Sequence, residues 1–128
     1  MPVEVIWDDE AKTIIRQKYT GHVVLDDYYI AVDKFVDLAK SVDYTVHSIM
    51  DRTDMLISQG SYLQAMRYAD KKMPDNIGLR VIIKANVMTK MMVNIGTRIA
   101  PRLISNVHIV DTLEDAREVI KSHQSDVS

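Results

Sequence analysis

The chain has 128 residues, which is the size of one ordinary domain. Hydrophobic residues make up 47% of it and charged residues 27%, as in a globular protein with a single core. The net charge of −2 gives no electrostatic reason to expect nucleic acid or an anionic membrane as a partner, and the absence of cysteine excludes disulfides, thiolate metal sites and a cysteine nucleophile.

The amino-terminal segment MPVEVIWDDE carries neither the basic nor the apolar region of a signal peptide. No apolar run in the chain approaches the ~18 residues that a membrane-spanning helix needs. We therefore expect a cytoplasmic protein without a membrane span.

The first part of the chain predicts a hairpin followed by a helix. Residues 3–7 and 12–19 are rich in β-branched side chains and are separated by a short polar segment, a pattern typical of two paired strands. From Asp26 to about Ser41, apolar residues recur at helical spacing, which predicts an amphipathic helix with one buried face.

The middle of the chain predicts a strand, a polar loop and a second helix. Residues 44–50, YTVHSIM, are typical of a strand. The segment 50–62, MDRTDMLISQGSY, is rich in acids and hydroxyls and is interpreted as the connecting loop. Apolar residues from Leu63 to Met73 predict the helix, which ends at Pro74 because proline cannot continue it.

The last part of the chain predicts two further pairs of a strand and a helix. Residues 78–85 form a nearly continuous apolar run, typical of a buried strand in a parallel sheet. A helix with an apolar face is predicted over 88–99, a short strand over 107–110 and a final helix over 111–123.

The predicted order is β-β-α-β-α-β-α-β-α, in a single domain over residues 1–123 with a frayed tail at 124–128. Strands that alternate with helices favour right-handed crossovers and a parallel sheet, to which the hairpin adds one antiparallel pair. The predicted fold class is therefore α/β, with helices packed on a mixed, mostly parallel sheet.

Three stretches carry a resemblance over nearly the whole chain: the opening hairpin IWDDEAKTIIRQKYTG, the segment SIMD at the end of the third strand, and the final strand and helix IVDTLEDAREVI. In this order the chain resembles STAS domains, the fold of anti-sigma factor antagonists and of the cytoplasmic ends of sulfate transporters. It is also similar to small bacterial proteins described as STAS/SEC14-like. The resemblance is one of pattern, and its motifs are short.

The resemblance implies a domain that works through contacts and needs no cofactor. STAS domains bind partner proteins, sometimes nucleotides or small ligands, and are usually not enzymes. In the regulated members a Ser or Thr at the start of the second helix is phosphorylated, commonly within Asp-Ser-x-Gly. Here Asp54 is not followed by Ser, and Ser58 keeps only the glycine two residues on.

Two serines precede the second predicted helix, Ser58 and Ser61. Ser61 and Gln64 have the spacing of a capping box, and Ser58 can also act as a cap. Such a cap contributes about 1 kcal/mol, which is reason enough for a serine at this place. A helix N-terminus also favours a phosphate. We interpret both serines as caps first and retain them as candidate phosphoacceptors.

A candidate loop site comprises Asp51, Arg52, Thr53 and Asp54. The segment lies at the carboxyl end of a predicted central strand, where ligands of open α/β sheets tend to bind. Two carboxylates can hold Mg²⁺ or act as acid and base, but no third metal ligand is predicted and Arg52 offsets their charge. We expect a local ion pair or a turn stabilised by an aspartate, and no metal site.

Methionine is unusually frequent, with eight residues in the chain. Met88, Met91, Met92 and Ile95 make the apolar arc of the third helix wider than one core-facing stripe needs. Methionine adapts to irregular surfaces and is common where partners are bound. These four residues are therefore a candidate interface.

The leading hypothesis is a non-enzymatic regulatory or scaffolding module that binds a partner protein, as a homodimer and with a possible phosphorylation switch. The alternative is a carrier of a small ligand or lipid, in which methionines would line an apolar pocket with four tyrosines, Tyr28, Tyr29, Tyr62 and Tyr68. A third class, a hydrolase that uses Asp51, Asp54 and a histidine, has no organised motif in the sequence. An enclosed apolar cavity would favour the carrier.

Overall fold

The computed structural model describes residues 2–58 and 62–127, except for the side chains of residues 56–58, 62, 88 and 125–127. Within these residues the chain forms five strands and four helices in the predicted order. The strands are β1 Val3–Trp7, β2 Ile14–Val23, β3 Val46–Ser58, β4 Ile77–Ile83 and β5 Val107–Val110. The helices are α1 Leu25–Lys40, α2 Tyr62–Lys72, α3 Val87–Ile99 and α4 Leu113–Val127.

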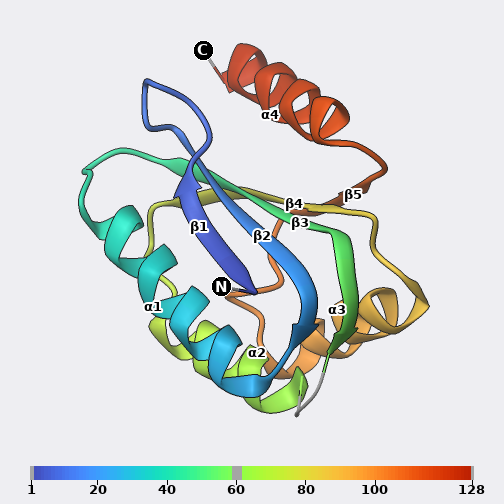
Figure 1. The fold of residues 1–128 in the computed structure, drawn as a ribbon. Helices are drawn as coiled ribbons and strands as arrows, with labels where there is room; N and C mark the ends of the chain where they lie inside the picture. Colours follow the sequence, from blue (N-terminus) through green and yellow to red (C-terminus); the bar gives the residue numbers. More distant parts are fainter. Residues whose placement is uncertain (1, 59–61, 128) are drawn as a thin grey trace.

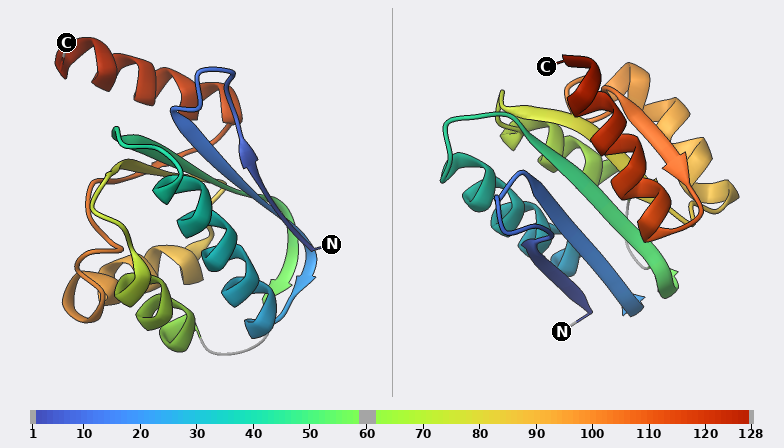
Figure 2. Two further views of the ribbon diagram at one scale, coloured as in Figure 1. Left: turned by 90° about the vertical axis from the view of Figure 1, so that its left-hand side faces the viewer. Right: turned by 90° about the horizontal axis from the view of Figure 1, so that it is seen from above.

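The strands form one sheet in the order β1-β2-β3-β4-β5. The pair β1–β2 is antiparallel and the other three pairs are parallel. Because each crossover moves one strand along the sheet in the same direction, the right-handed rule sends the intervening helices to one face. Helices α1, α2 and α3 do lie on one face, and α4 covers the other (Figures 1 and 2).

Side chains at three helix starts satisfy backbone N–H groups, as the local sequence favours. Asp27 accepts a hydrogen bond from the Val24 N–H, Asn86 accepts one from the Thr89 N–H, and Thr112 accepts one from the Asp115 N–H. Each of these bonds lies at the junction of a strand and a helix, and together they fix where α1, α3 and α4 begin.

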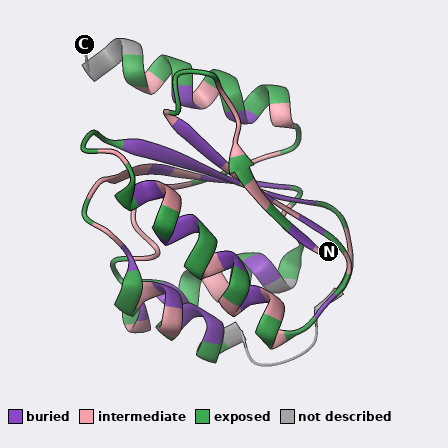
Figure 3. Ribbon diagram, turned by 60° about the vertical axis from the view of Figure 1, so that its left-hand side comes forward, coloured by how far each residue is buried: buried purple, intermediate pink, exposed green. Residues whose placement is uncertain are grey.

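The sheet separates two bodies of apolar packing. Beneath α4, Ala116 and Ile120 pack on Ile49 and Val81 of the central strands. On the other face, side chains of β1, β2 and β3 pack against α1, whose buried residues face the sheet while its outer residues are exposed (Figure 3). Burial of apolar area on both faces, at roughly 25 cal/mol per Å², is the main force that holds the layers together.

Strand β3 is the largest departure from the sequence prediction. The prediction ends it near Met50, whereas the strand continues to Ser58. It pairs with β4 as far as Asp51 and with β2 as far as Ser58. Its partner β2 is also longer than predicted and ends at Val23. Pairing between two long strands has therefore overridden the low β-propensity of the aspartates and the glycine in these segments.

The helices differ from the prediction at their ends. Helix α1 begins at Leu25 with Val24 as its cap, and α4 continues to Val127, through most of the predicted tail. None of the helices, over the residues that the structure describes, is long and apolar enough to span a membrane.

Candidate functional site

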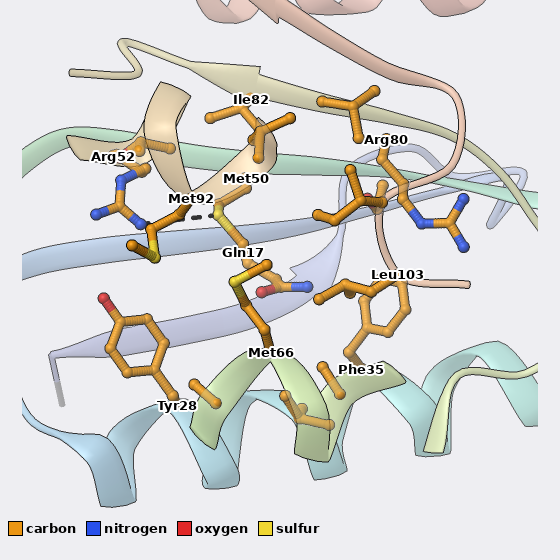
Figure 4. A pocket seen from close by; sticks show the side chains of 18 of the residues that line it. Gln17, Tyr28, Phe35, Met50, Arg52, Met66, Arg80, Ile82, Met92 and Leu103 are labelled. Atoms are coloured by element: carbon orange, nitrogen blue, oxygen red, sulfur yellow. Dashed lines mark hydrogen bonds between the residues drawn. The ribbon is translucent and has the colours of Figure 1, made fainter. Parts of the chain in front are cut away.

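An apolar cavity of about 150 Å³ lies between the sheet and the layer formed by α1, α2 and α3. Its floor comes from β2, β3 and β4, and its walls from the three helices and from the segment that follows α3. Figure 4 shows the side chains that surround it. Alternation along the strands explains the floor, because every second residue faces this side of the sheet. In β3 these residues are Ser48, Met50 and Arg52.

Most of the cavity wall is apolar, and methionines supply much of it. Met50 lies on the floor, Met66 comes from α2 and Met92 comes from α3 (Figure 4). Met73, which directly follows α2, also lines the cavity. Methionine side chains are unbranched and flexible, so this wall can adapt its shape to a molecule inside.

Five polar side chains line the same cavity: Gln17, Ser48, Arg52, Arg80 and Thr89. Gln17 and Thr89 each make a hydrogen bond to a neighbouring side chain. Gln17 accepts a hydrogen bond of 2.8 Å from the Tyr19 hydroxyl, and Thr89 donates one of 2.9 Å to the Asn86 side chain. These bonds hold the Gln17 side chain on the floor and the Thr89 side chain in the α3 wall in fixed positions. Buried polar groups in proteins are normally hydrogen-bonded in this way.

Arg80 fixes the segment that closes one end of the cavity. Its Nη atoms donate to the carbonyl oxygens of Gly78, Arg102 and Ser105 at 3.2, 2.8 and 2.8 Å. Its Nε is buried with no acceptor among the described residues, and burial lowers the pKa of the guanidinium. The bonded segment carries Leu103, which lines the cavity.

The opposite end of the cavity holds Arg52 and Tyr28 (Figure 4). Arg52 is only 8% exposed, and its Nη1 donates to the thioether sulfur of Met50 at 4.0 Å. The Tyr28 hydroxyl donates to the sulfur of Met55, also at 4.0 Å.

The prediction that residues 51–54 form a loop is wrong, because all four residues belong to strand β3. Alternation places the buried Asp51 toward the α4 face and Arg52 toward the cavity, so they do not form one site. The Asp51 carboxylate accepts the Thr53 N–H at 2.9 Å, and the exposed Asp54 pairs with Lys18 at 3.3 Å.

A bulge accompanies this segment. Lys18 is opposite Asp51 and Thr20 is opposite Asp54, so β3 has one more residue than β2 between these pairs. Bulges change the direction of side chains and are frequent near functional sites. Arg52 and Thr53 are the two β3 residues within this bulge, and Arg52 lines the cavity.

The candidate phosphoacceptors are only partly covered by the structure. Ser58 is the last residue of β3 and not the cap of α2, which begins at Tyr62. The prediction that Ser58 caps the helix is therefore wrong. Ser61 lies outside the described residues, as does the side chain of Ser58. Phosphorylation at either position stays a prediction.

The predicted interface on α3 divides between two surroundings. Met92 lines the cavity, whereas Met91 and Ile95 are 53% and 38% exposed on the outer surface. Val87, which the sequence reasoning overlooked, is 74% exposed at the same helical spacing. The Met88 side chain lies outside the described residues.

The tyrosines named for a carrier also divide. Tyr28 lines the cavity. The rings of Tyr29 and Tyr68 are 4.5 Å apart at the surface between α1 and α2, and the Tyr68 hydroxyl donates to Asp33. The Tyr62 side chain lies outside the described residues.

The residues considered for hydrolysis or metal binding do not converge. His47 lies on the α4 side, where its Nδ1 accepts the Leu79 N–H at 2.9 Å and its ring meets that of His123. Asp51 and Asp54 have the separate partners given above. In the part of the chain that the structure describes, no group of three or more His, Asp or Glu side chains is arranged to hold a metal ion.

Comparisons of the sequence with protein-family models and with curated proteins gave no match. Among solved structures, the chain is similar to an uncharacterised protein of the DUF3478 family from Shewanella loihica PV-4, which has a SpoIIAA-like fold. The TM-score is 0.64 at 10% sequence identity, over 91% of this chain and 90% of that chain. At this identity the likeness shows the fold alone, and it confirms the STAS-like α/β fold predicted from the sequence.

Proposed function

We propose that this domain binds a small, largely apolar molecule in the cavity between the sheet and helices α1–α3. The observation that carries the proposal is the cavity itself, about 150 Å³ in volume and lined mainly by apolar side chains. An engineered apolar cavity of about the same volume, ~150 Å³, binds benzene or xenon. An apolar group of about six to eight carbon atoms is a suitable occupant by this measure.

The energetics of the cavity favour an occupant. Burying a methylene group of a ligand against an apolar wall contributes about 0.8 kcal/mol. Each added methylene therefore raises the affinity about fourfold until the space is full. The methionine side chains of the wall are flexible, so the cavity can enlarge somewhat around a longer ligand.

A series of straight-chain alcohols tests this function directly. Binding of 1-butanol, 1-hexanol, 1-octanol and 1-decanol is measured by calorimetry and by native mass spectrometry. We expect the affinity to rise steeply along the series and then to level off or fall. No binding of any member, or weak binding without dependence on chain length, overturns the proposed function.

A matched pair of variants on α2 locates the binding site. Ala69 is buried in the cavity wall, whereas Arg67 is exposed on the same helix. Ala69→Leu fills part of the space and should reduce the affinity for 1-octanol about tenfold or more, by overpacking. Arg67→Leu adds the same side chain outside the cavity and should leave the affinity unchanged. Equal effects of the two variants place the alcohol elsewhere.

A second function, self-association, is favoured by one specific observation. Val87, Met91 and Ile95 are exposed at intervals of four residues and form an apolar stripe on the outside of α3. Covering such a stripe with a second copy of the chain would bury it, as in a scaffolding homodimer. Light scattering over a concentration series tests this function. We expect a dimer that Met91→Glu dissociates; a monomer at all concentrations contradicts it.

A further inference from the structure

Three neighbouring strands each contribute a polar side chain to one row on the floor of the cavity: Gln17 of β2, Ser48 of β3 and Arg80 of β4. Ser48 is directly opposite Arg80 in the pairing of β3 with β4. On its other side Ser48 is opposite Ile15 of β2. Gln17 follows Ile15 by two residues and therefore faces the same side of the sheet.

Two members of this row are buried and have hydrogen-bonding groups left over. Gln17 and Ser48 are each only 9% exposed. The Gln17 Oε1 accepts the Tyr19 hydroxyl, which fixes the amide and leaves its Nε2 without an acceptor among the described residues. The Ser48 hydroxyl makes no hydrogen bond to any described residue. Buried polar groups in proteins normally have a partner, so an atom of a bound molecule has a place beside these two.

Arg80 adds a third donor to the row. Its Nη atoms are bound to backbone carbonyl groups, whereas its Nε is buried and has no acceptor among the described residues. Figure 4 shows the nitrogen of the Gln17 side chain on the side of the cavity where Leu103 and Arg80 lie. The positive charge of the guanidinium, beside Ser48 in the strand pairing, favours the negative end of a dipole at this place.

A neutral carbonyl oxygen is the group that best matches the row. The Gln17 Nε2, the Ser48 hydroxyl and the Arg80 Nε all donate, and a carbonyl oxygen accepts two hydrogen bonds without bringing a donor of its own. A carboxylate matches less well, because burying its charge is costly and the Nη atoms that could take it with two parallel bonds are bound to the backbone.

We propose that the ligand of this cavity is an apolar ketone or ester, whose carbonyl oxygen accepts hydrogen bonds from the Gln17 Nε2 and the Ser48 hydroxyl. One oxygen atom can reach both donors because they stand on adjacent strands, about 4.8 Å apart. This assignment rests on the ligand-binding function proposed above and specifies the chemical class of the ligand. The apolar part, about six to eight carbon atoms, lies among the apolar side chains of the wall.

Three ligands built on the same ring test the assignment: acetophenone, ethylbenzene and benzoate. Dissociation constants are measured by calorimetry at neutral pH. Acetophenone should bind at least as tightly as ethylbenzene, because the donors of the floor replace the hydrogen bonds that its carbonyl group makes in water. A cavity that offered the carbonyl group no donor would bind acetophenone about tenfold or more weakly than ethylbenzene. Benzoate should bind least tightly, because its charge loses the most hydration.

A matched pair of variants inside the cavity locates the carbonyl group. Ser48→Ala removes a donor of the row, so the affinity for acetophenone should fall about fivefold, while that for ethylbenzene stays within about twofold. Thr89→Val removes another hydroxyl of the wall, but this hydroxyl donates to Asn86, so the ratio of the two affinities should not change. Gln17→Met removes the amide at similar volume and should lower the ratio about as much as Ser48→Ala.

The outcomes separate this assignment from the function on which it rests. The carbonyl assignment is overturned if acetophenone binds about tenfold or more weakly than ethylbenzene, or if benzoate binds more tightly than acetophenone. It is also overturned if Ser48→Ala and Gln17→Met both keep the ratio of the unsubstituted chain. In these cases the binding of ethylbenzene still supports the apolar-ligand function. If neither acetophenone nor ethylbenzene binds, the assignment fails, and the proposed function fails with it only if the straight-chain alcohols do not bind either.

Discussion

Arg117 of α4 holds the carboxylate of Asp8 with two parallel hydrogen bonds of 2.8 and 2.9 Å, although the two residues are 109 positions apart in the sequence. Arg16 of β2 donates to the same carboxylate at 2.9 Å. The Asp8 side chain is only 2% exposed and lies between the two guanidinium groups, which lower the pKa of its carboxyl group. The group connects the turn after β1 with the helix on the far face of the sheet, and it anchors α4.

Asp8→Ala should lower the free energy of unfolding by about 2 kcal/mol, measured by urea denaturation. Breaking a fully buried pair costs more, about 3–5 kcal/mol, but Arg117 is half exposed and regains water. Asp33→Ala is the control, because its bond to Lys72 joins two half-exposed side chains. That variant should lose much less stability than Asp8→Ala, because solvent screens an exposed ion pair. Similar losses in the two variants would show that Asp8 is no anchor.

The stability of the domain should fall as the pH drops below about 6.5, because of His47. Burial lowers the pKa of its imidazole from 6.5, repulsion from His123 lowers it further, and Asp9 opposes the shift. The unfolded chain therefore takes up a proton at a pH where the folded chain resists it. The stability is fully present above pH 6.5 and is lost as the pH falls through the lowered pKa of the folded state.

Urea midpoints measured between about pH 7.5 and pH 5.5 check this dependence. His47→Gln should flatten the curve over this range, whereas His108→Gln, at an exposed position on β5, should leave its slope unchanged. A curve that is flat in the unsubstituted chain would contradict the lowered pKa of His47.

Gly78→Ala should destabilise the fold by about 2 kcal/mol, through overpacking. A Cβ at this position would lie 2.5 Å from Nδ1 and 2.6 Å from Cε1 of His47, and 3.0 Å from a methyl group of Thr45. The ring cannot move aside without losing its hydrogen bond with the Leu79 N–H. A double-mutant cycle with His47→Ala measures the coupling, and purely additive losses would exclude the steric cause.

Gly96→Ala should weaken ligand binding, because α3 passes very close to its neighbours at this point. An added Cβ would overlap the terminal methyl group of Met66 and Cγ1 of Ile104, and both side chains line the cavity. Displacing them into the cavity should cost about 1–3 kcal/mol, divided between stability and affinity. Calorimetry with 1-octanol measures the loss of affinity, and thermal unfolding measures the loss of stability. An affinity equal to that of the unsubstituted chain would show that the displaced side chains move outward instead.

The order of elements, the parallel sheet and the amphipathic helices could be predicted from the sequence, because hydrophobic periodicity and turn residues report on local structure. The strand over 107–110 has the predicted bounds. The length of β3 could not be predicted in this way. Its second half is a strand because β2 pairs with it, and such pairing depends on residues more than 30 positions apart in the chain.

The same reasoning explains what was missed in the site. The alternation of Ser48, Met50 and Arg52 is visible in the sequence and would have assigned Arg52 to one face of a strand, had the strand been extended past Met50. The bulge and the grouping of Arg52 with Tyr28 required the three-dimensional structure. The abundance of methionine is visible in the sequence, but only the structure separates Met92, which lines the cavity, from Met91, which is exposed on the outer surface.

The separation of the two helix layers by the sheet makes this domain a practical starting point for directed evolution. Neighbouring residues of β3 serve different layers, since Ile49 packs beneath α4 and Met50 lines the cavity. Substitutions of Met50 and of the helix residues in the cavity wall therefore change side chains on the face of the sheet opposite to α4. Stabilising substitutions beneath α4 can be introduced first. The more stable domain then tolerates destabilising substitutions in the cavity wall that alter ligand selectivity, as in the design of a biosensor.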